Sequence, residues 1–241
     1  MPETLVLLHG FGGTRRAWDP VLPELDGETY RPLALDLRGH GERAGARPVD
    51  FDGCVEDVLA AVPGRFALCG YSLGGRVALH VALAAPERVT RLVLVATSAG
   101  IDDPGERARR EADDTAFARD LDTMTIEQYA DRWQAQPIFA GTPPDAARWW
   151  REDLLRNDPR ALAAALRGLG AAVMTPLWDR LGELTMPATV VVGDADAKFT
   201  ALADRFMAGL PDARLVVIPG AGHGLPREAP RELADAIEGR L

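Results

Sequence analysis

Six short and almost uninterrupted apolar segments limit the folds open to this chain. They are TLVLLHG (4–10), RPLALDLRGHG (31–41), RFALCGYS (65–72), RLVLVATS (91–98), ATVVVGDAD (188–196) and ARLVVIPGAGH (213–223). A strand that is covered on both faces is apolar throughout, whereas a half-exposed strand alternates apolar with polar residues. Helix-forming stretches lie between the segments, at residues 53–62, 74–85, 200–209 and 228–240. The sequence therefore predicts an α/β fold whose mostly parallel sheet is flanked by helices and joined by right-handed crossovers.

This alternation of strands and helices stops between about residues 100 and 182. No strand-like segment occurs there, and Arg, Asp, Ala and Trp recur with helical spacing. Because the stretch connects two expected strands, we expect it to fold back over the C-terminal edge of the sheet as a helical cap. The expected domains are a core of residues 1–99 and 183–241 and a cap of residues 100–182.

Composition limits the partners that the protein can bind and indicates its cellular compartment. The 241 residues carry a net charge of −9, which disfavours nucleic acid and anionic membranes as partners. No segment reaches membrane-spanning length, and no basic leader with a cleavage site is found. The two cysteines, Cys54 and Cys69, predict neither a disulfide framework nor a metal cluster. We therefore expect a cytoplasmic protein without a metal site, and the sequence leaves open whether it is a monomer or a small homo-oligomer.

A serine motif provides the first candidate for chemistry. GYSLG (70–74) follows an expected strand and precedes an expected helix, the context in which G-x-S-x-G forms a nucleophile elbow with Ser72 exposed. The alternative is a glycine-rich turn with a helix-capping serine. Asp196 and His223 each end a later strand segment, which gives the Ser, Asp, His order of α/β-hydrolase triads. Asp194 is the competing acid, although the G-x-x-D spacing favours Asp196, and a structural loop histidine is the alternative for His223.

Two further loops follow early strands. In HGFGG (9–13) the backbone N–H of Phe11 is expected to join that of Leu73 in an oxyanion hole, the alternative being a glycine turn with a buried Phe. DLRGHG (36–41) is expected to be a structural turn in which His40 braces loops.

The position of Arg76 is unusual. It lies one turn beyond Ser72, near the N-terminus of the expected helix, where the helix dipole disfavours a cation. A bound anion would offset this cost, whereas the alternative is a surface arginine. In a chain of net charge −9, an anion has to be held by specific cations, and guanidinium groups bind carboxylates in a bidentate manner.

Across nearly its whole length the chain resembles the α/β-hydrolase superfamily. Four segments are also similar, in order and approximate spacing, to motifs of the 2-succinyl-6-hydroxy-2,4-cyclohexadiene-1-carboxylate synthases of menaquinone biosynthesis. They are GYSLGGR (70–76), WQAQPIF (133–139), LRN (155–157) and GDADAKF (193–199). The resemblance implies a lyase that needs no cofactor and eliminates pyruvate from 2-succinyl-5-enolpyruvyl-6-hydroxy-3-cyclohexene-1-carboxylate, a small molecule with three carboxylates.

The resemblance also implies roles for individual residues. The implied substrate-binding residues are Tyr71, Arg76, Arg110, Trp133, Arg156 and Lys198. Arg109 is easily mistaken for Arg110, a solvated helix face is the alternative for both cap arginines, and a salt bridge to Asp194 is the alternative for Lys198. In the implied reaction Ser72 is a base, supported by the imidazole and the carboxylate of the triad, and not a nucleophile.

Two other functions remain compatible with the sequence. The first is a carboxylic-ester or C–C bond hydrolase that uses the same triad. The second is a binding protein that keeps the fold and senses a small molecule, although such a receptor has no need for a complete triad and oxyanion loop.

Overall fold

Six parallel strands form one sheet, in the order β2-β1-β3-β4-β5-β6, in the computed structural model, which describes residues 1–241. The strands are Glu3–Leu8 (β1), Tyr30–Leu35 (β2), Phe66–Tyr71 (β3), Val89–Val95 (β4), Ala188–Gly193 (β5) and Ala213–Ile218 (β6). Every neighbouring pair is parallel. The predicted α/β fold with a parallel sheet is confirmed, and all six apolar segments contain a strand.

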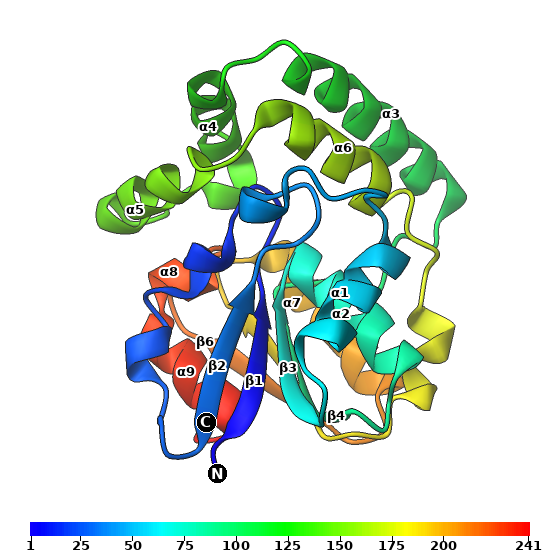
Figure 1. Ribbon diagram of the computed structural model, residues 1–241, viewed down its shortest axis with the longest axis vertical. Coiled ribbons are helices and arrows are strands. Elements are labelled where there is room, and N and C mark those ends of the chain that lie inside the picture. The colour runs from blue at the N-terminus through cyan, green and yellow to red at the C-terminus, as the bar shows by residue number, and fades with distance from the viewer.

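Helices cover both faces of the sheet. Figure 1 shows α1 and α2 on one face and α9 on the other. The core helices are Phe51–Ala61 (α1), Leu73–Ala84 (α2), Ala197–Gly209 (α7), Leu225–Glu228 (α8) and Pro230–Glu238 (α9). Short 3-10 turns span Arg15–Trp18, Leu22–Glu24, Gly41–Arg43, Pro137–Phe139 and Trp178–Glu183.

The first two expected helices lie within two residues of α1 and α2, and the last two differ more from the structure. The helix expected at 200–209 begins at Ala197, because the Asp196 side chain accepts a hydrogen bond from Phe199 N and so caps it. The helix expected at 228–240 is divided into α8 and α9 at Ala229, whose φ of −144° is not helical. Pro230, which has no N–H to donate, then begins α9.

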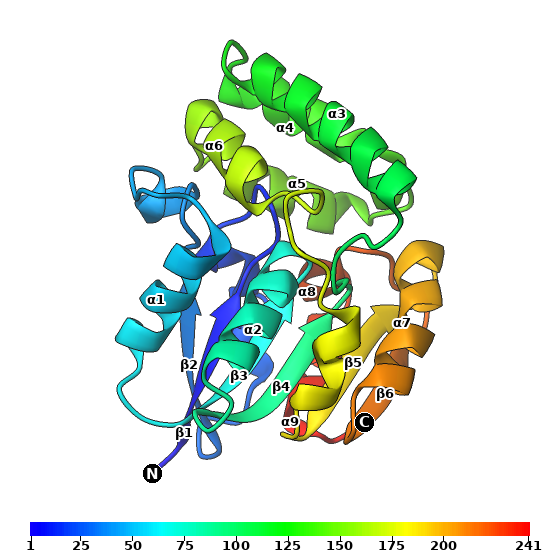
Figure 2. The ribbon, with the colours of Figure 1, turned by 90° about the vertical axis from the view of Figure 1, so that its right-hand side faces the viewer.

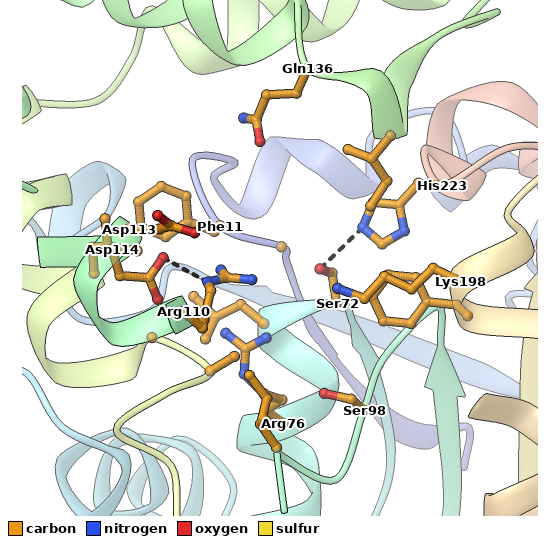
Figure 3. Close-up of a pocket in the computed structure, with 18 of the residues that line it drawn as sticks. Phe11, Ser72, Arg76, Ser98, Arg110, Asp113, Asp114, Gln136, Lys198 and His223 are labelled. Carbon is orange, nitrogen blue, oxygen red and sulfur yellow. Dashed lines mark hydrogen bonds and ion pairs between the residues drawn. The ribbon is translucent and has the colours of Figure 1, made fainter. Parts of the chain in front are cut away.

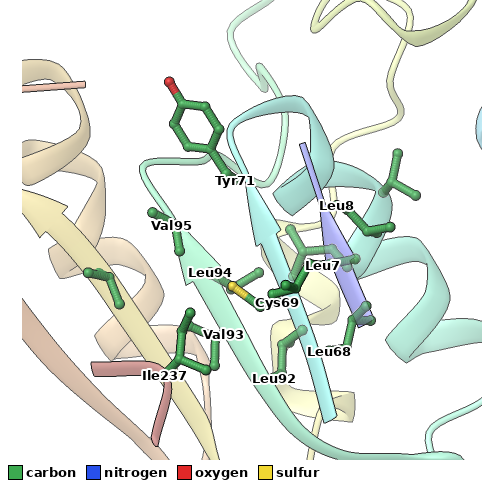
Figure 4. Packing of buried hydrophobic residues seen from close by; sticks show 14 of the residues in the cluster. Leu7, Leu8, Leu68, Cys69, Tyr71, Leu92, Val93, Leu94, Val95 and Ile237 are labelled. Atoms are coloured by element: carbon green, nitrogen blue, oxygen red, sulfur yellow. The ribbon is translucent and has the colours of Figure 1, made fainter. Parts of the chain in front are cut away.

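The central strands explain the uninterrupted apolar segments. All six residues of β3 are buried, and Leu68, Cys69, Leu92 and Leu94 lie in a cluster of 54 buried residues (Figure 4). The edge strand β6 differs, because its burial alternates and exposes part of its apolar surface.

Four helices in the middle of the chain lie above the C-terminal ends of the strands (Figures 1 and 2). They are Pro104–Leu121 (α3), Ile126–Gln134 (α4), Pro144–Leu154 (α5) and Pro159–Leu169 (α6). The side chains of Asp103, Thr125 and Asp158 cap the N-termini of three of them. The four helices share a ten-residue apolar cluster of their own. Between this cluster and the sheet lie the residues that follow the strands.

Candidate active site

Ser72 lies in a tight turn between β3 and α2. Its φ of 53° and ψ of −110° are unfavourable for a residue with a side chain. The flanking glycines make this turn possible: a Cβ on Gly70 would lie 2.3 Å from Gly74 O, and one on Gly74 would lie 2.2 Å from Leu8 O. The two glycines of the motif are thus required by packing, and the turn presents Ser72 to the cavity between core and cap.

The structure brings Ser72, Asp196 and His223 together, and Figure 3 shows the contact between Ser72 and His223. His223 Nε2 lies 3.2 Å from Ser72 Oγ, and His223 Nδ1 lies 2.8 Å from Asp196 Oδ2. Asp196 and His223 are both buried, and the ring of Phe199 stacks on the imidazole with 4.7 Å between centroids. An Nδ1–H that donates to the carboxylate leaves Nε2 free to accept the serine proton.

Asp194 has a different role in the structure. Its side chain is exposed, and Oδ1 accepts a hydrogen bond of 2.7 Å from Gly220 N. It therefore fastens the loop after β6, and the geometry favours Asp196 as the acid.

The loop after β1 places the two expected oxyanion donors at the cavity. Phe11 and Leu73 both line it, and the N–H of Leu73, at the start of α2, has no partner within its helix. Asn157 holds the loop in place, because its Nδ2 donates to Gly12 O at 2.8 Å and its Oδ1 accepts from Gly41 N at 3.0 Å.

His40 braces the same loop. It is fully buried, and its ring makes edge contacts with Phe11 at 5.5 Å and with His9 at 5.0 Å. Burial holds the pKa of His40 well below its usual value, so the ring is neutral. His9 Nε2 in turn accepts a hydrogen bond from Leu37 N. As expected, the turn at 36–41 is structural.

A cavity of about 830 Å³ lies over Ser72. This volume suits a small-molecule ligand. Its aromatic lining comes from both core and cap: Phe11, Tyr71, Phe117, Trp133, Phe139 and Trp150. The ring centroid of Trp133 lies 5.1 Å from that of Phe11, so the cap contributes directly to the space above the oxyanion loop.

Arg76 lies on the cavity wall and is not a surface arginine. Its Nη2 donates to Leu169 O at 3.0 Å, whereas its Nε is shielded from solvent and has no partner. Burial, reinforced by the nearby charge of Arg110, lowers the pKa of Arg76 to about 10, although Asp114 acts in the opposite direction. No carboxylate of the protein forms an ion pair with Arg76, so its positive charge remains available to a ligand.

Arg110 and Lys198 lie close to Arg76. Arg110 Nε donates to Asp114 Oδ1 at 2.7 Å (Figure 3), while Arg109 beside it is exposed. Burial, and then the charge of Arg110, lower the pKa of Lys198. Lys198 forms no salt bridge with Asp194, since that carboxylate serves the loop after β6. Arg76, Arg110 and Lys198 thus line the same cavity as Ser72, and of the acids that also line it, Asp114 is paired with Arg110.

Arg156 does not belong to this site. It is exposed and does not line the cavity, because the chain turns after α5 and directs the neighbouring Asn157 inward instead. The prediction that Arg156 binds substrate is therefore corrected: the LRN segment contributes an amide that supports the oxyanion loop.

The sequence motifs did not single out Asp114 and Arg227, two of the charged residues that line the cavity. The sequence does contain a signal for Asp114, because it lies four residues after Arg110, which is the spacing of ion pairs on a helix. Arg227 is buried, lines the cavity and follows His223 by four residues. Its closeness in sequence to the histidine is the only signal. No cluster of His, Cys, Asp or Glu side chains has the form of a metal site.

Comparison with known proteins agrees with this geometry. Residues 5–236 match the profile of the alpha/beta hydrolase family. The chain belongs to this family. This α/β hydrolase is 32% identical to the putative 2-succinyl-6-hydroxy-2,4-cyclohexadiene-1-carboxylate synthase of Bacillus subtilis (strain 168), over 95% of the chain and 86% of the relative.

Two more comparisons extend the range of relatives. The α/β hydrolase superposes on the solved structure of MenH from S. aureus with a TM-score of 0.92 and 30% identity, covering 98% of this chain and 92% of that one. It is also 33% identical to the pimeloyl-[acyl-carrier protein] methyl ester esterase of Nitrosomonas europaea, over 91% of the chain and 88% of the relative. These similarities identify this α/β hydrolase as an enzyme. None of its helices has the length and apolar character needed to cross a bilayer.

Proposed function

We propose that the enzyme is a carbon–oxygen lyase that eliminates pyruvate from 2-succinyl-5-enolpyruvyl-6-hydroxy-3-cyclohexene-1-carboxylate to give 2-succinyl-6-hydroxy-2,4-cyclohexadiene-1-carboxylate. One observation carries the proposal: Arg76 is a cavity-lining cation next to Ser72 with no carboxylate partner in the protein. The similarity to synthases of this name supports it. The substrate is a free small polycarboxylate, in keeping with a chain of net charge −9 that concentrates cations at one place.

In the proposed reaction Ser72 acts as a base. His223, oriented by Asp196, takes the Ser72 hydroxyl proton as the serine oxygen removes the ring proton α to the succinyl ketone. The C–H electron pair forms a C=C bond to the neighbouring ring carbon, the ring alkene shifts by one position toward the enolpyruvyl-bearing carbon, and the C–O bond to the enolpyruvyl group breaks. The expelled enolpyruvate regains a proton and tautomerises to pyruvate, so no water is consumed.

The oxyanion loop stabilises the charge that develops during this step. Proton removal places negative charge on the ketone oxygen, and the N–H groups of Phe11 and Leu73 are the donors available at the cavity. Each well-placed donor of this kind stabilises a transition state by about 3 kcal/mol. An enolate and a tetrahedral acyl intermediate need the same donors, which explains how a hydrolase fold supports an elimination.

The cations hold the carboxylates of the substrate. Arg76 and Lys198 have no ion-pair partner in the protein, and Arg110 uses only its Nε for Asp114 (Figure 3). The remaining N–H groups of Arg110 are therefore available to a carboxylate. Three positive charges facing one part of the cavity favour a polyanion over a neutral ester.

The direct test is to supply the enolpyruvyl cyclohexene to the purified enzyme and to follow pyruvate release. Ser72→Ala should abolish turnover, and intact-protein mass spectrometry during turnover should show no covalent adduct on the wild-type enzyme. An acyl-serine that accumulates with this substrate would show that Ser72 is a nucleophile and would overturn the mechanism.

A second candidate is a carboxylic-ester hydrolase that uses the same triad. The strained elbow at Ser72 and the methyl ester esterase among the relatives favour it. A screen of p-nitrophenyl esters with short and medium acyl chains separates the two: the lyase should leave them almost untouched, while rapid cleavage without pyruvate release would favour the esterase.

A further inference from the structure

Arg227 is a buried cation that the proposed reaction does not yet use. It lies on α8 and lines the cavity, and only 9% of its surface is accessible to solvent. Its Nε and Nη1 are shielded from solvent and have no hydrogen-bond partner, and no carboxylate forms an ion pair with it. An arginine is rarely buried without a partner, because desolvating an unpaired charge is costly.

The surroundings of Arg227 do not neutralise it. Its guanidinium lies over the ring of Trp150, 4.6 Å from the centroid, and a ring face orients a cation without removing its charge. Asp153, an acid of the cap that acts on Arg227, is occupied by Thr14: Oδ2 accepts from Thr14 N at 3.0 Å, and Oδ1 accepts from the Thr14 hydroxyl. Burial lowers the pKa of Arg227, and Tyr71 and Asp153 only partly oppose this.

Arg227 also lies in a different part of the cavity from the other cations. The charged residues that act on Arg76 are Arg110 and Asp114, whereas those that act on Arg227 are Asp153 and Glu228, together with the neutral Tyr71 hydroxyl group. The aromatic side chains of Phe139 and Tyr71 link the Arg227 region to His223, with ring centroids 5.8 Å and 5.4 Å from the imidazole. The triad therefore has cations available in two separate regions.

We propose that Arg227 binds a second carboxylate of the substrate, so that the substrate is held between Arg227 and the cluster of Arg76, Arg110 and Lys198. This inference rests on the proposed function, because it assumes a substrate with several carboxylates. A ligand held at two points has its reacting carbon fixed relative to Ser72, which an anchor at one end alone does not achieve. Arg227 is then a specificity-determining residue that distinguishes a polycarboxylate from a monocarboxylate.

Binding of three inert aromatic acids tests this directly. 2-Succinylbenzoate carries a succinyl and a ring carboxylate, 4-oxo-4-phenylbutanoate lacks the ring carboxylate, and 2-butanoylbenzoate lacks the terminal one. We would titrate each calorimetrically into the wild-type enzyme, Arg227→Met and Arg227→Lys. Arg88→Met is the matched control, because Arg88 also lies over a ring, that of Phe66 at 5.8 Å, but is not part of the cavity.

The expected result is selective. Arg227→Met should weaken the binding of 2-succinylbenzoate by about 10- to 100-fold, the effect of losing a hydrogen-bonded charge. The binding of one of the two monoacids should be unaffected. Arg227→Lys should recover part of the loss, and Arg88→Met should bind all three acids as the wild type does. If a low melting temperature shows that Arg227→Met folds poorly, Arg227→Lys takes its place. It should bind the diacid less tightly than the wild type, by a smaller factor, and should still bind one monoacid as the wild type does.

Other outcomes overturn the proposal. The first is a wild-type enzyme that does not bind the diacid. The others are an Arg227→Met enzyme that binds all three acids more weakly by the same factor, or one that binds all three as tightly as the wild type. Failure of the proposed function is distinguishable, because it is measured by pyruvate release. If the enzyme binds the diacid through Arg227 but releases no pyruvate, the second anion site stands and the proposed reaction is wrong.

Discussion

Replacement of Arg76 by methionine should stabilise the fold and impair the reaction at the same time. The pKa of Arg76 is lowered to about 10, mainly by burial and then by Arg110. At about 1.36 kcal/mol per pH unit, this lowering corresponds to a cost of about 3 kcal/mol to the folded protein. Methionine retains the apolar stem and removes the charge, but it loses the hydrogen bond to Leu169 O, which is worth about 1 kcal/mol.

The balance is a gain of about 1 to 2 kcal/mol in the free energy of unfolding. In a chain of this length, that corresponds to a melting temperature higher by about 2 to 8 °C. The sign of the pH dependence follows from the lowered pKa. Below about pH 9 the guanidinium is charged in both the folded and unfolded states, so the gain should be constant between pH 6 and 8. It should shrink only as the pH rises through 10, where folded Arg76 loses its proton first.

Urea and thermal unfolding of Arg76→Met and the wild type, at several pH values, would measure this gain. The kcat/KM for pyruvate release should fall by about 10- to 100-fold, because a charged contact to the substrate is lost. Arg107→Met is the control, since Arg107 also donates to a main-chain carbonyl, that of Ile101, but lies outside the cavity. It should lower stability slightly and leave kcat/KM unchanged. An Arg76→Met enzyme that unfolds more easily than the wild type, or that keeps full activity, would refute the reasoning.

Three other substitutions test the site. Gly74→Ala should prevent folding or destabilise the enzyme by several kcal/mol, because the added Cβ would overlap a carbonyl of β1. Gly64→Ala is the control: its Cβ would meet nothing within 4 Å, so it should unfold at nearly the wild-type urea concentration. Asp196→Asn should lower kcat by about 10³- to 10⁴-fold, and Asp194→Asn should keep most of it; the reverse order in a steady-state assay would exchange their roles. Arg156→Ala should leave kcat/KM for pyruvate release within about twofold of the wild type, since the residue is exposed outside the cavity; a tenfold loss would return it to the substrate site.

The substrate-binding surface was only partly predictable because it depends on how the cap packs. Whether Arg156 or Asn157 faces the core depends on the loop against which the end of α5 packs. Asn157 donates to Gly12 O in that loop, which lies 145 residues earlier in the sequence. Arg227 belongs to a four-residue helix with no pattern of its own. Its location becomes visible only when Trp150 of the cap is placed against it.

The chain by itself determined the order of strands and helices and the candidate catalytic residues. Apolar segments specify buried parallel strands, and parallel strands end at one common edge, so Ser72, Asp196 and His223 had to lie along that edge. Only the tertiary structure decided which cations share the cavity and which lack a partner. The direction of a side chain and its distance from a counter-charge depend on contacts between segments that are far apart in the sequence, here the cap and the core.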